Sequence, residues 1–340
     1  MKQQRPSHNL RDLLTCTTSC TITRLRDCVG SLRDLPKQES QHCCLVALYN
    51  LSDDQAEYQL RDRLSFMRFV GLGMEDAVPD AKTLWLYRKA PTKAGSVEAL
   101  FNQFDAYLKE RGYLAMGGAA QGSDDPKDRW NGCGGGQIID ATIVPAPRQR
   151  NLRDENAKIK AGETPVEWEG KPAKNRQKDK DARWTKKHGK AHYGYKNHIN
   201  VDRRHKLVRR YAVTSASVHD SQKLGDMLDP ANTASGVWAA SAYRSAEIEA
   251  TLVARNLTSH IHRRGNRNKP PTKSQEAANK TRSKVRARVE HVFGNQQNSM
   301  GGKFIRTIGI LRATAKIGLQ NLAYNMRRLV VLERCTMAAG

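Results

Sequence analysis

The run QIIDATIV at residues 137–144 decides the fold of this chain. It is apolar and rich in β-branched residues, it follows a glycine-rich turn, and it ends at Pro145, which is the pattern of a buried β-strand. One carboxylate, Asp140, interrupts its middle. A charge inside an apolar strand is costly unless it is paired or holds a metal. Asp140 is therefore either a structural aspartate capped by backbone amides or a metal ligand presented by a central strand.

The overall charge of the chain indicates a polyanionic partner. Its 340 residues include 58 lysines and arginines against 34 acidic residues, which gives a net charge of +24. This excess is far beyond what solubility requires, so nucleic acid is the simplest partner. A basic membrane-surface protein is the alternative, but no apolar run approaches the length of a membrane span, and the polar N-terminus lacks a secretory signal. The seven cysteines show no disulfide-like framework, which predicts a cytoplasmic protein with reduced thiols.

Upstream of the Asp140 run, residues 46–114 are predicted to form a small helical domain for DNA-end binding or dimerisation. Ser52 and Gln55 form a capping-box pattern, and Ser96 opens an amphipathic helix that Gly112 ends. Simple packing is the alternative role of this domain, and the sequence does not separate the two.

The segments on either side of this domain are less informative. Residues 1–45 show no clear period and form a poorly defined N-terminal segment. Residues 115–136 are typical of a linker rich in Gly, Asp and Ser. We expect a catalytic domain over residues 137–312 and a C-terminal helix over residues 313–340.

Residues 148–190 are the most basic and least apolar stretch of the chain. A charge run is usually a solvated surface, but this one adjoins the Asp140 strand, so we favour a phosphate-binding, partly disordered insertion. Trp168 and Trp184 lie among the charges and either stack on unpaired bases or pin the segment to the core. The candidate DNA-binding residues are Arg148, Arg150, Arg153, Lys174, Arg176, Lys178, Lys180, Arg183, Lys186, Lys187 and Lys190, with Arg282 and Lys284 further along the chain.

After the insertion, the predicted elements follow the order of an RNase H-like α/β domain. We expect a hairpin of strands at 193–201 and 207–215, a helix from 218 to 230, a strand at 236–239, a helix from Ser245, a strand at 260–262, a long basic helix at 276–296 and a final helix at 313–333.

The long basic helix carries a second candidate metal ligand, Glu290. Two-metal phosphoryl transfer needs several carboxylates that converge on two ions about 4 Å apart. Arg286 precedes Glu290 by four residues, so both side chains project to one side of the helix. On these residues alone, an ordinary i,i+4 surface salt bridge is the favoured interpretation.

An ordered set of six blocks resembles the DDE transposases of bacterial insertion sequences, and most of all the group named after insertion sequence five. The similarity covers roughly residues 46–116 and 137–334, and it is the set that is specific rather than any one block. The blocks are IIDATIVPAPRQRN, KNRQKDKDARWTKKHGKAHYGYKNHINVDRRHKLVRRYAV, SVHDSQKL, VWAASAYRS, RSKVRARVEHVFG and KIGLQNLAYNMRRL.

This resemblance implies an RNase H-like (DDE integrase/transposase) catalytic domain and a two-metal site that takes Mg²⁺, with Mn²⁺ as a substitute. It implies cut-and-paste transfer of double-stranded DNA between terminal inverted repeats and a target, by a homodimer that pairs two ends in the bacterial nucleoid. Asp140 matches the family's first Asp and Glu290 its Glu. Arg286 matches the Arg that precedes this Glu in related signatures.

Ala240 departs from the family pattern, which has V-W-A-D-S-A-Y-R-S where this chain has VWAASAYRS. Loss of one ligand from a two-metal site should abolish metal pairing while leaving the fold intact. The resemblance therefore predicts an enzyme that is inactive as written. Either the chain is a deliberately inactivated variant, which we favour, or the element carries a dead copy.

The prediction is thus a DNA transposase in which Asp140, position 240 and Glu290 would carry the metals and Arg286 would hold phosphate or orient Glu290. A non-enzymatic DNA-binding protein, such as a transposition repressor or a domesticated transposase, explains the charge and Ala240 together. An RNase H-like nuclease is a third, weaker hypothesis. An aspartate codon at position 240 in the parent gene would favour the enzyme.

Overall fold

The computed structural model describes residues 37–114, 135–232, 235–265 and 270–337. Most of the predicted N-terminal segment and nearly all of the predicted linker lie outside the described residues. The chain divides into two compact units, and residues 108–328 form the unit that contains the Asp140 strand. Within the described ranges, no helix combines the length and the apolar character needed to cross a membrane.

The described part of the first unit contains five N-terminal helices and the end of the C-terminal helix, residues 329–337. The five helices are α3 (Lys37–Tyr49), α4 (Asp53–Asp62), α5 (Leu64–Val70), α6 (Ala81–Ala94) and α7 (Ser96–Glu110), of which α7 runs into the second unit. The predicted capping box is confirmed, because the Ser52 hydroxyl accepts from the Gln55 amide and the Gln55 side chain accepts from the Ser52 amide. Helix α3 packs against α5 and α6, and α4 packs against α6.

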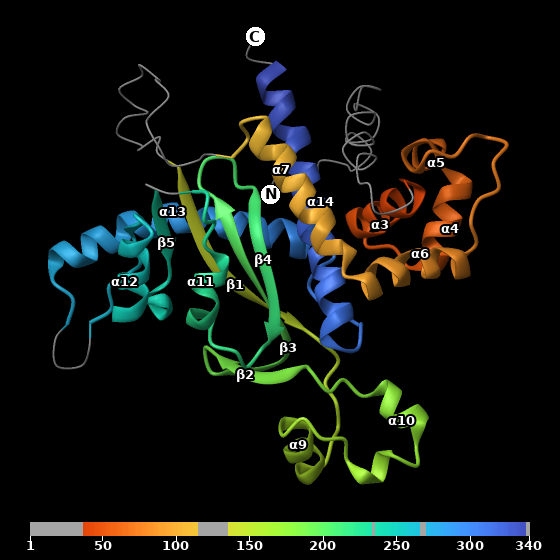
Figure 1. Ribbon diagram of the computed structural model, residues 1–340, viewed down its shortest axis with the longest axis horizontal. Helices are drawn as coiled ribbons and strands as arrows, with labels where there is room; N and C mark the ends of the chain where they lie inside the picture. Colours follow the sequence, from red (N-terminus) through yellow and green to blue (C-terminus); the bar gives the residue numbers. More distant parts are fainter. Residues whose placement is uncertain (1–36, 115–134, 233–234, 266–269, 338–340) are drawn as a thin grey trace, which may run out of the picture. The chain divides into compact units, whose positions relative to one another are not determined.

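A mixed sheet forms the centre of the second unit (Figure 1). The strand order is β2-β3-β1-β5-β6, with β4 beside β3; β1, β3 and β4 pair antiparallel, whereas β5 and β6 run parallel to β1. This topology is consistent with the predicted RNase H-like fold. The strands are β1 (Gly136–Pro145), β2 (Arg183–Lys187), β3 (Lys190–Asp202), β4 (Val208–Ser215), β5 (Gly236–Ala239) and β6 (Thr258–Ser259).

The helices that follow the sheet strands match the predicted order with two differences. The expected helix at 218–230 is a 3₁₀ turn at Asp220–Lys223 followed by the short α11 (Leu224–Met227). The last strand begins earlier than expected, although its hydrogen bonds to β5 continue through the predicted residues 260–262. The remaining helices are α12 (Ala246–Ala254), α13 (Lys273–Asn298) and α14 (Ile310–Met337).

The alternation of side chains along β1 separates two faces of the sheet. Ile139 packs with Val237 and Ala239 against a cluster that includes Leu224 and Leu252 from the helices of one face. Side chains at even positions of β1 point to the other face, where α13 lies across β1 and β5. Asp140 is therefore directed toward α13.

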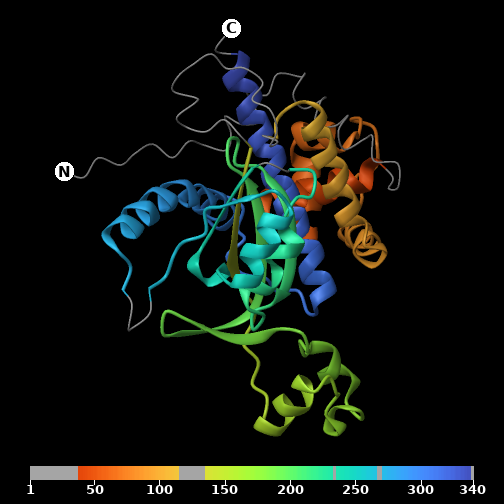
Figure 2. The ribbon, with the colours of Figure 1, turned by 60° about the vertical axis from the view of Figure 1, so that its left-hand side comes forward.

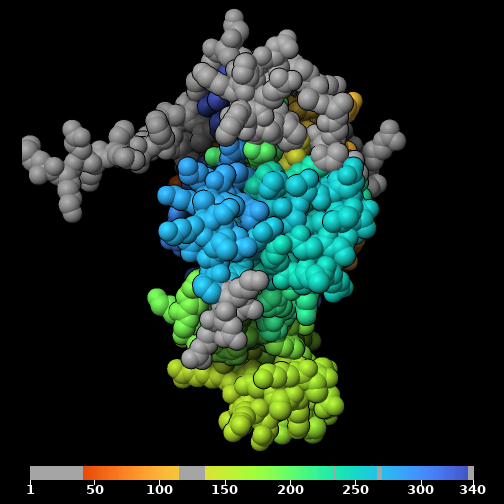
Figure 3. All heavy atoms as spheres, turned by 90° about the vertical axis from the view of Figure 1, so that its left-hand side faces the viewer, coloured from red at the N-terminus to blue at the C-terminus, as the bar shows by residue number. Residues whose placement is uncertain are grey.

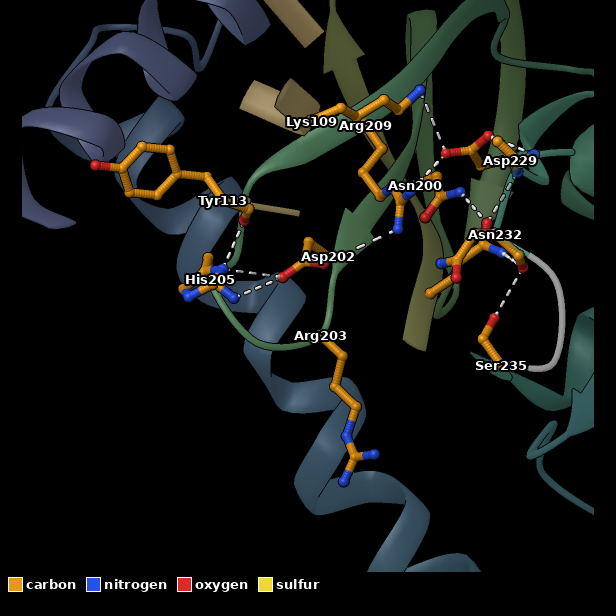
Figure 4. A network of polar contacts seen from close by, with 12 residues as sticks. Lys109, Tyr113, Asn200, Asp202, Arg203, His205, Arg209, Asp229, Asn232 and Ser235 are labelled. Carbon is orange, nitrogen blue, oxygen red and sulfur yellow. Dashed lines mark hydrogen bonds and ion pairs between the residues drawn. The ribbon is translucent and has the colours of Figure 1, made fainter. Parts of the chain in front are cut away.

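A buried network of polar contacts holds the start of β1, the end of β3 and the start of β4 together (Figure 4). Arg209 is fully buried and pairs with Asp229 at 2.5 Å and with Asp202 at 4.0 Å, and Lys109 approaches Asp229 at 3.5 Å. Paired charges of this kind fix the geometry of the frame on which the Asp140 face is built.

The segment before β2 forms a small lobe, here called the insertion lobe (residues 148–182; Figures 1 and 3). It contains α9 (Arg153–Lys160), a 3₁₀ turn at Val166–Trp168 and α10 (Pro172–Gln177). Trp168 is fully buried and its indole N–H donates to Glu155 Oε1 at 2.7 Å. The prediction of partial disorder is wrong for this segment, because Trp168 has a core of its own to pack in and is not available to stack on bases.

Candidate active site

Strand pairing places position 240 beside Asp140. β1 and β5 run parallel, and their last pair is Ile139 with Ala239. Asp140 is the next residue of β1, and Ala240 directly follows β5 and packs against the cluster that contains Ile139, Val237 and Ala239. Positions 140 and 240 therefore directly follow two residues that pair on neighbouring strands.

Helix α13 supplies the remaining two candidate residues to the same face. Val289, Val292 and Phe293 are buried, which fixes the rotation of the helix over the sheet. In this orientation Arg286 Nε lies 3.3 Å from Asp140 Oδ2. Arg286 thus forms its ion pair with Asp140 across elements, and the simple i,i+4 salt bridge with Glu290 is not the contact that the structure shows.

The buried Asp140 carboxylate has few hydrogen bonds or ion pairs to stabilise its charge. Its side chain is 14% exposed, and its Oδ1 accepts one backbone amide, that of Ala141, at 2.9 Å. Burial raises the pKa of Asp140, and the nearby Glu290 carboxylate raises it further, while Arg286, the Ala141 amide and Lys187 lower it. A set of capping amides, which a purely structural role would require, is therefore lacking around this carboxylate in the described part of the chain.

The donors present do not fit a two-metal site. Position 240 offers only a methyl group, and Glu290 is exposed on α13. In the parts of the chain that the structure describes, no three His, Cys, Asp or Glu side chains come together in a way that would hold a metal ion. The Arg286 guanidinium is the cation that the structure places on Asp140.

Tyr243, which the sequence did not single out, lies buried just beyond position 240. Its hydroxyl has no hydrogen-bond partner among the described residues. Burial, and then the charge of Asp140, raise the pKa of Tyr243, so the phenol stays protonated. Its position three residues after Ala240 was the available signal, but a tyrosine in an apolar block is equally typical of a core residue.

The candidate DNA-binding residues divide into two groups by burial. Four half-buried ones act inside the chain: Lys174 pairs with Glu155, Lys178 donates to Asn151, Lys180 donates to Thr164 and Arg183 donates to the Ile159 carbonyl. A fifth half-buried residue, Arg282, donates to the Ile261 carbonyl. The exposed ones are Arg148, Arg150, Arg153, Arg176, Lys186, Lys187, Lys190 and Lys284.

Trp184 differs from Trp168 in its accessibility. Its side chain is 47% exposed, and the Arg148 guanidinium carbon lies 5.6 Å from its ring centroid. A cation over an exposed indole is a surface that nucleobases and phosphates both recognise. Of the two tryptophans, only Trp184 is therefore open to a ligand.

Comparison with known proteins gives matches over both units. The family model described as the transposase DDE domain matches residues 131–326, and the model described as a transposase domain (DUF772) matches residues 40–90. The transposase for insertion sequence element IS1106 of Neisseria meningitidis serogroup B is 30% identical over 193 residues, which is 56% of this chain and 63% of that protein. The match thus spans less than two thirds of that relative. No solved structure matches.

Proposed function

This chain belongs to the family of transposases with a DDE domain, which cleave DNA by phosphoryl transfer, and from that premise we propose that it binds the ends of its insertion sequence without cutting them. The terminal inverted repeats are the proposed DNA, and a homodimer in the bacterial nucleoid is the proposed form that pairs two ends. A second DNA, the target, would bind only in an active form.

One observation supports the proposal that the chain does not cleave DNA. The residue after the Ile139–Ala239 pair is Asp140 on β1 and Ala240 after β5, and a carboxylate in place of this alanine would complete the proposed set of three with Asp140 and Glu290. Family members typically use a divalent metal, and Mg²⁺ takes oxygen ligands in near-octahedral geometry. With two carboxylates, one of them paired to Arg286, two divalent ions would face too little negative charge.

The proposed contacts to DNA rest on the basic residues. The net charge of +24 favours a polyanion, and the exposed lysines and arginines of the insertion lobe and of β2 are free to meet backbone phosphates. Arg286 would either hold a phosphate or keep Glu290 in position once Asp140 is bound to a metal.

A side-by-side assay of three proteins tests this proposal: the chain as written, Ala240→Asp and Ala240→Asn. Each is incubated with labelled inverted-repeat DNA and Mg²⁺ or Mn²⁺, and binding and cleavage are measured separately. All three should bind the DNA, and only Ala240→Asp should cleave it, because asparagine has the same size as aspartate without its charge. Glu290→Gln combined with Ala240→Asp should bind and not cleave.

Cleavage by the chain as written at a rate comparable to that of Ala240→Asp would refute the three-carboxylate assignment. Binding by all variants with cleavage by none would favour the second candidate, a transposition repressor or domesticated transposase. The observation that favours this candidate is the same alanine, since a protein that only occupies DNA ends has no need of the second carboxylate.

A further inference from the structure

Two arginines from different elements share one backbone carbonyl just beyond β6. Arg244 follows the 3₁₀ turn Ser241–Tyr243, and its Nη1 donates to the Ile261 carbonyl at 3.2 Å. Arg282 lies on α13, and its Nη1 donates to the same carbonyl at 3.4 Å. Two guanidinium groups that donate to one oxygen lie close enough to repel each other, so this arrangement favours a ligand that brings negative charge. Arg244 and Arg282 are here called the arginine pair.

The segment that provides the shared carbonyl is held on both sides. The His262 amide donates to the Ala239 carbonyl at 3.2 Å, which continues the pairing with β5 up to the residue before position 240. On the other side, the Asn279 side chain of α13 accepts from the Arg263 amide at 3.0 Å and donates to the Arg263 carbonyl at 2.7 Å. The arginine pair is therefore fixed where the ends of β5 and β6 meet α13.

Positive charge exceeds negative charge around the arginine pair. Among the described residues, Glu249 of α12 is the one carboxylate within ion-pair distance, and it lies 3.4 Å from Arg244 Nη1. Burial, and then the charges of Arg263 and Arg244, lower the pKa of Arg282, whereas Glu249 raises it. Within the described ranges, the hydrogen bonds of both guanidinium groups run through Nη1, so Nε and Nη2 of each keep donors for a further acceptor.

The arginine pair lies one helical turn from the candidate active site. Arg282 precedes Arg286 by four residues, so the two side chains lie on one face of α13, and Arg286 Nε is 3.3 Å from Asp140 Oδ2. The N-terminal part of α13 extends beyond the sheet (Figure 2), and on the face shown in Figure 3 it lies beside the elements that follow β5. The Arg244 side chain is 32% exposed on this side of the molecule, so a large anion can reach it.

We propose that Arg244 and Arg282 together bind one phosphate of the DNA backbone next to the phosphate that lies at Asp140. This inference rests on the proposed function and names a contact to the DNA end. One helical turn rises about 5.4 Å, which corresponds to one or two nucleotides of a strand at about 3.4 Å each. A phosphate between the two guanidinium groups removes their repulsion, and the planar donor forks match its oxygens.

The alternative is that the two arginines only attach the Ile261 segment to its neighbours. Such a role predicts a loss of stability on substitution and no dependence on any particular phosphate. Lys280 provides a matched control, because it is an exposed cation on the same helix, two residues before Arg282 and therefore on another face.

The first test uses the chain with Ala240 retained and inverted-repeat DNAs in which one end phosphate at a time is an uncharged methylphosphonate. The unsubstituted chain should lose about tenfold in affinity when the phosphate bound by the arginine pair is neutral. Arg282→Gln and Arg244→Gln should each lose about tenfold on unmodified DNA and nothing further on that same modified DNA. Lys280→Gln should still lose about tenfold when this phosphate is neutral.

Further losses by both arginine variants at every phosphate within about two nucleotides of the cleavage point would overturn the inference, as would a different phosphate for each arginine. Specific binding of inverted-repeat DNA in a gel-shift would then leave the proposed function intact. Absence of specific binding by the unsubstituted chain would refute both.

A second measurement separates binding from folding. Urea unfolding shows whether each variant is folded, and Arg282→Lys keeps the charge without the planar fork. Its affinity should lie between those of Arg282→Gln and the unsubstituted chain, and it should respond to the same modified phosphate. Lowered stability of Arg282→Gln with full affinity for unmodified DNA would show attachment alone and contradict the proposal.

Discussion

Asp140 in the sheet and Glu155 in the insertion lobe are two carboxylates that their surroundings treat in opposite ways. Glu155 in the lobe accepts hydrogen bonds from the Trp168 indole at 2.7 Å, the Leu152 amide at 2.8 Å and the Lys174 ammonium at 3.1 Å. These bonds, that of Trp168 first, lower the pKa of Glu155 to about 2. Asp140 in the sheet has one amide and one longer contact to Arg286, and burial raises its pKa.

This difference is the one expected between a carboxylate that stabilises the fold and a carboxylate that destabilises it but is needed for a reaction. A fully bonded carboxylate organises its surroundings, and here Glu155 joins α9, the Trp168 turn and α10 into one lobe. A buried charge with few partners costs stability. We therefore propose that Glu155 serves folding and Asp140 serves function, and each of the following experiments tests one half of this proposal.

The largest effect on stability is expected for Glu155→Ala. It leaves the buried Trp168 indole N–H without its acceptor and removes the partner of Lys174, so the lobe should lose about 2 kcal/mol, as loss of a buried hydrogen bond to a charged group does. Urea unfolding and the rate of proteolysis within residues 148–182 would measure the loss. Glu167→Ala is the control, because Glu167 makes only a long, exposed contact to Lys158 and should cost under about 0.5 kcal/mol.

Acid should remove the contribution of Glu155. A carboxylate whose folded pKa is lowered stabilises the fold above its unfolded pKa, here near 4.5, and this stabilisation disappears as the pH falls toward about 2. The stability difference between the unsubstituted protein and Glu155→Gln should therefore be constant above pH 5 and shrink between about pH 4.5 and 2. A difference that does not depend on pH would mean that Glu155 is not held as the anion.

Asp140→Asn should change stability by less than about 1 kcal/mol in either direction, because the raised pKa shows that the charged form gains little from its surroundings. The same substitution in the Ala240→Asp background should abolish cleavage. The measurements are urea unfolding and the end-cleavage assay. A stability loss as large as that of Glu155→Ala would make Asp140 structural and remove the contrast between the two regions.

The sequence predicts the sheet site better than the lobe, for physical reasons. The Asp140 strand is apolar and rich in β-branched residues and the strand before Ala240 is a short apolar run, so the burial of both follows from local pattern. The ion pair between Arg286 and Asp140 joins residues far apart in sequence, and the spacing of Arg286 and Glu290 pointed to a local contact instead. Long-range partners of a side chain leave no period in the chain.

The sequence analysis missed the strand β2, which forms a hairpin with the start of β3, and the ordered structure of the insertion lobe. Both segments are rich in polar and charged residues, which give no clear hydrophobic pattern. β2 is the strand RWTKK, which is charged and lies at an edge of the sheet, so it lacks the alternation that marks a half-buried strand. The His188-Gly189 turn was the available sign of a hairpin. The lobe depends on the contact between Glu155 and Trp168, thirteen residues apart, and basic composition alone suggested disorder there.

The smallest expected effect is on the salt dependence of DNA binding, which compares a lysine of the sheet with a lysine of the insertion lobe. A lysine that neutralises a DNA phosphate releases counterions, and its removal lowers the slope of log affinity against log salt concentration by about 1. Lys186 is exposed on β2, whereas the Lys174 ammonium is already held by Glu155. Lys186→Ala should therefore reduce the slope by nearly 1, and Lys174→Gln by clearly less. Binding of inverted-repeat DNA between about 50 and 200 mM salt measures both slopes. Equal reductions would show that Glu155 releases Lys174 to the DNA, so that the lobe's carboxylate, like that of the sheet, exchanges its partner when the substrate binds.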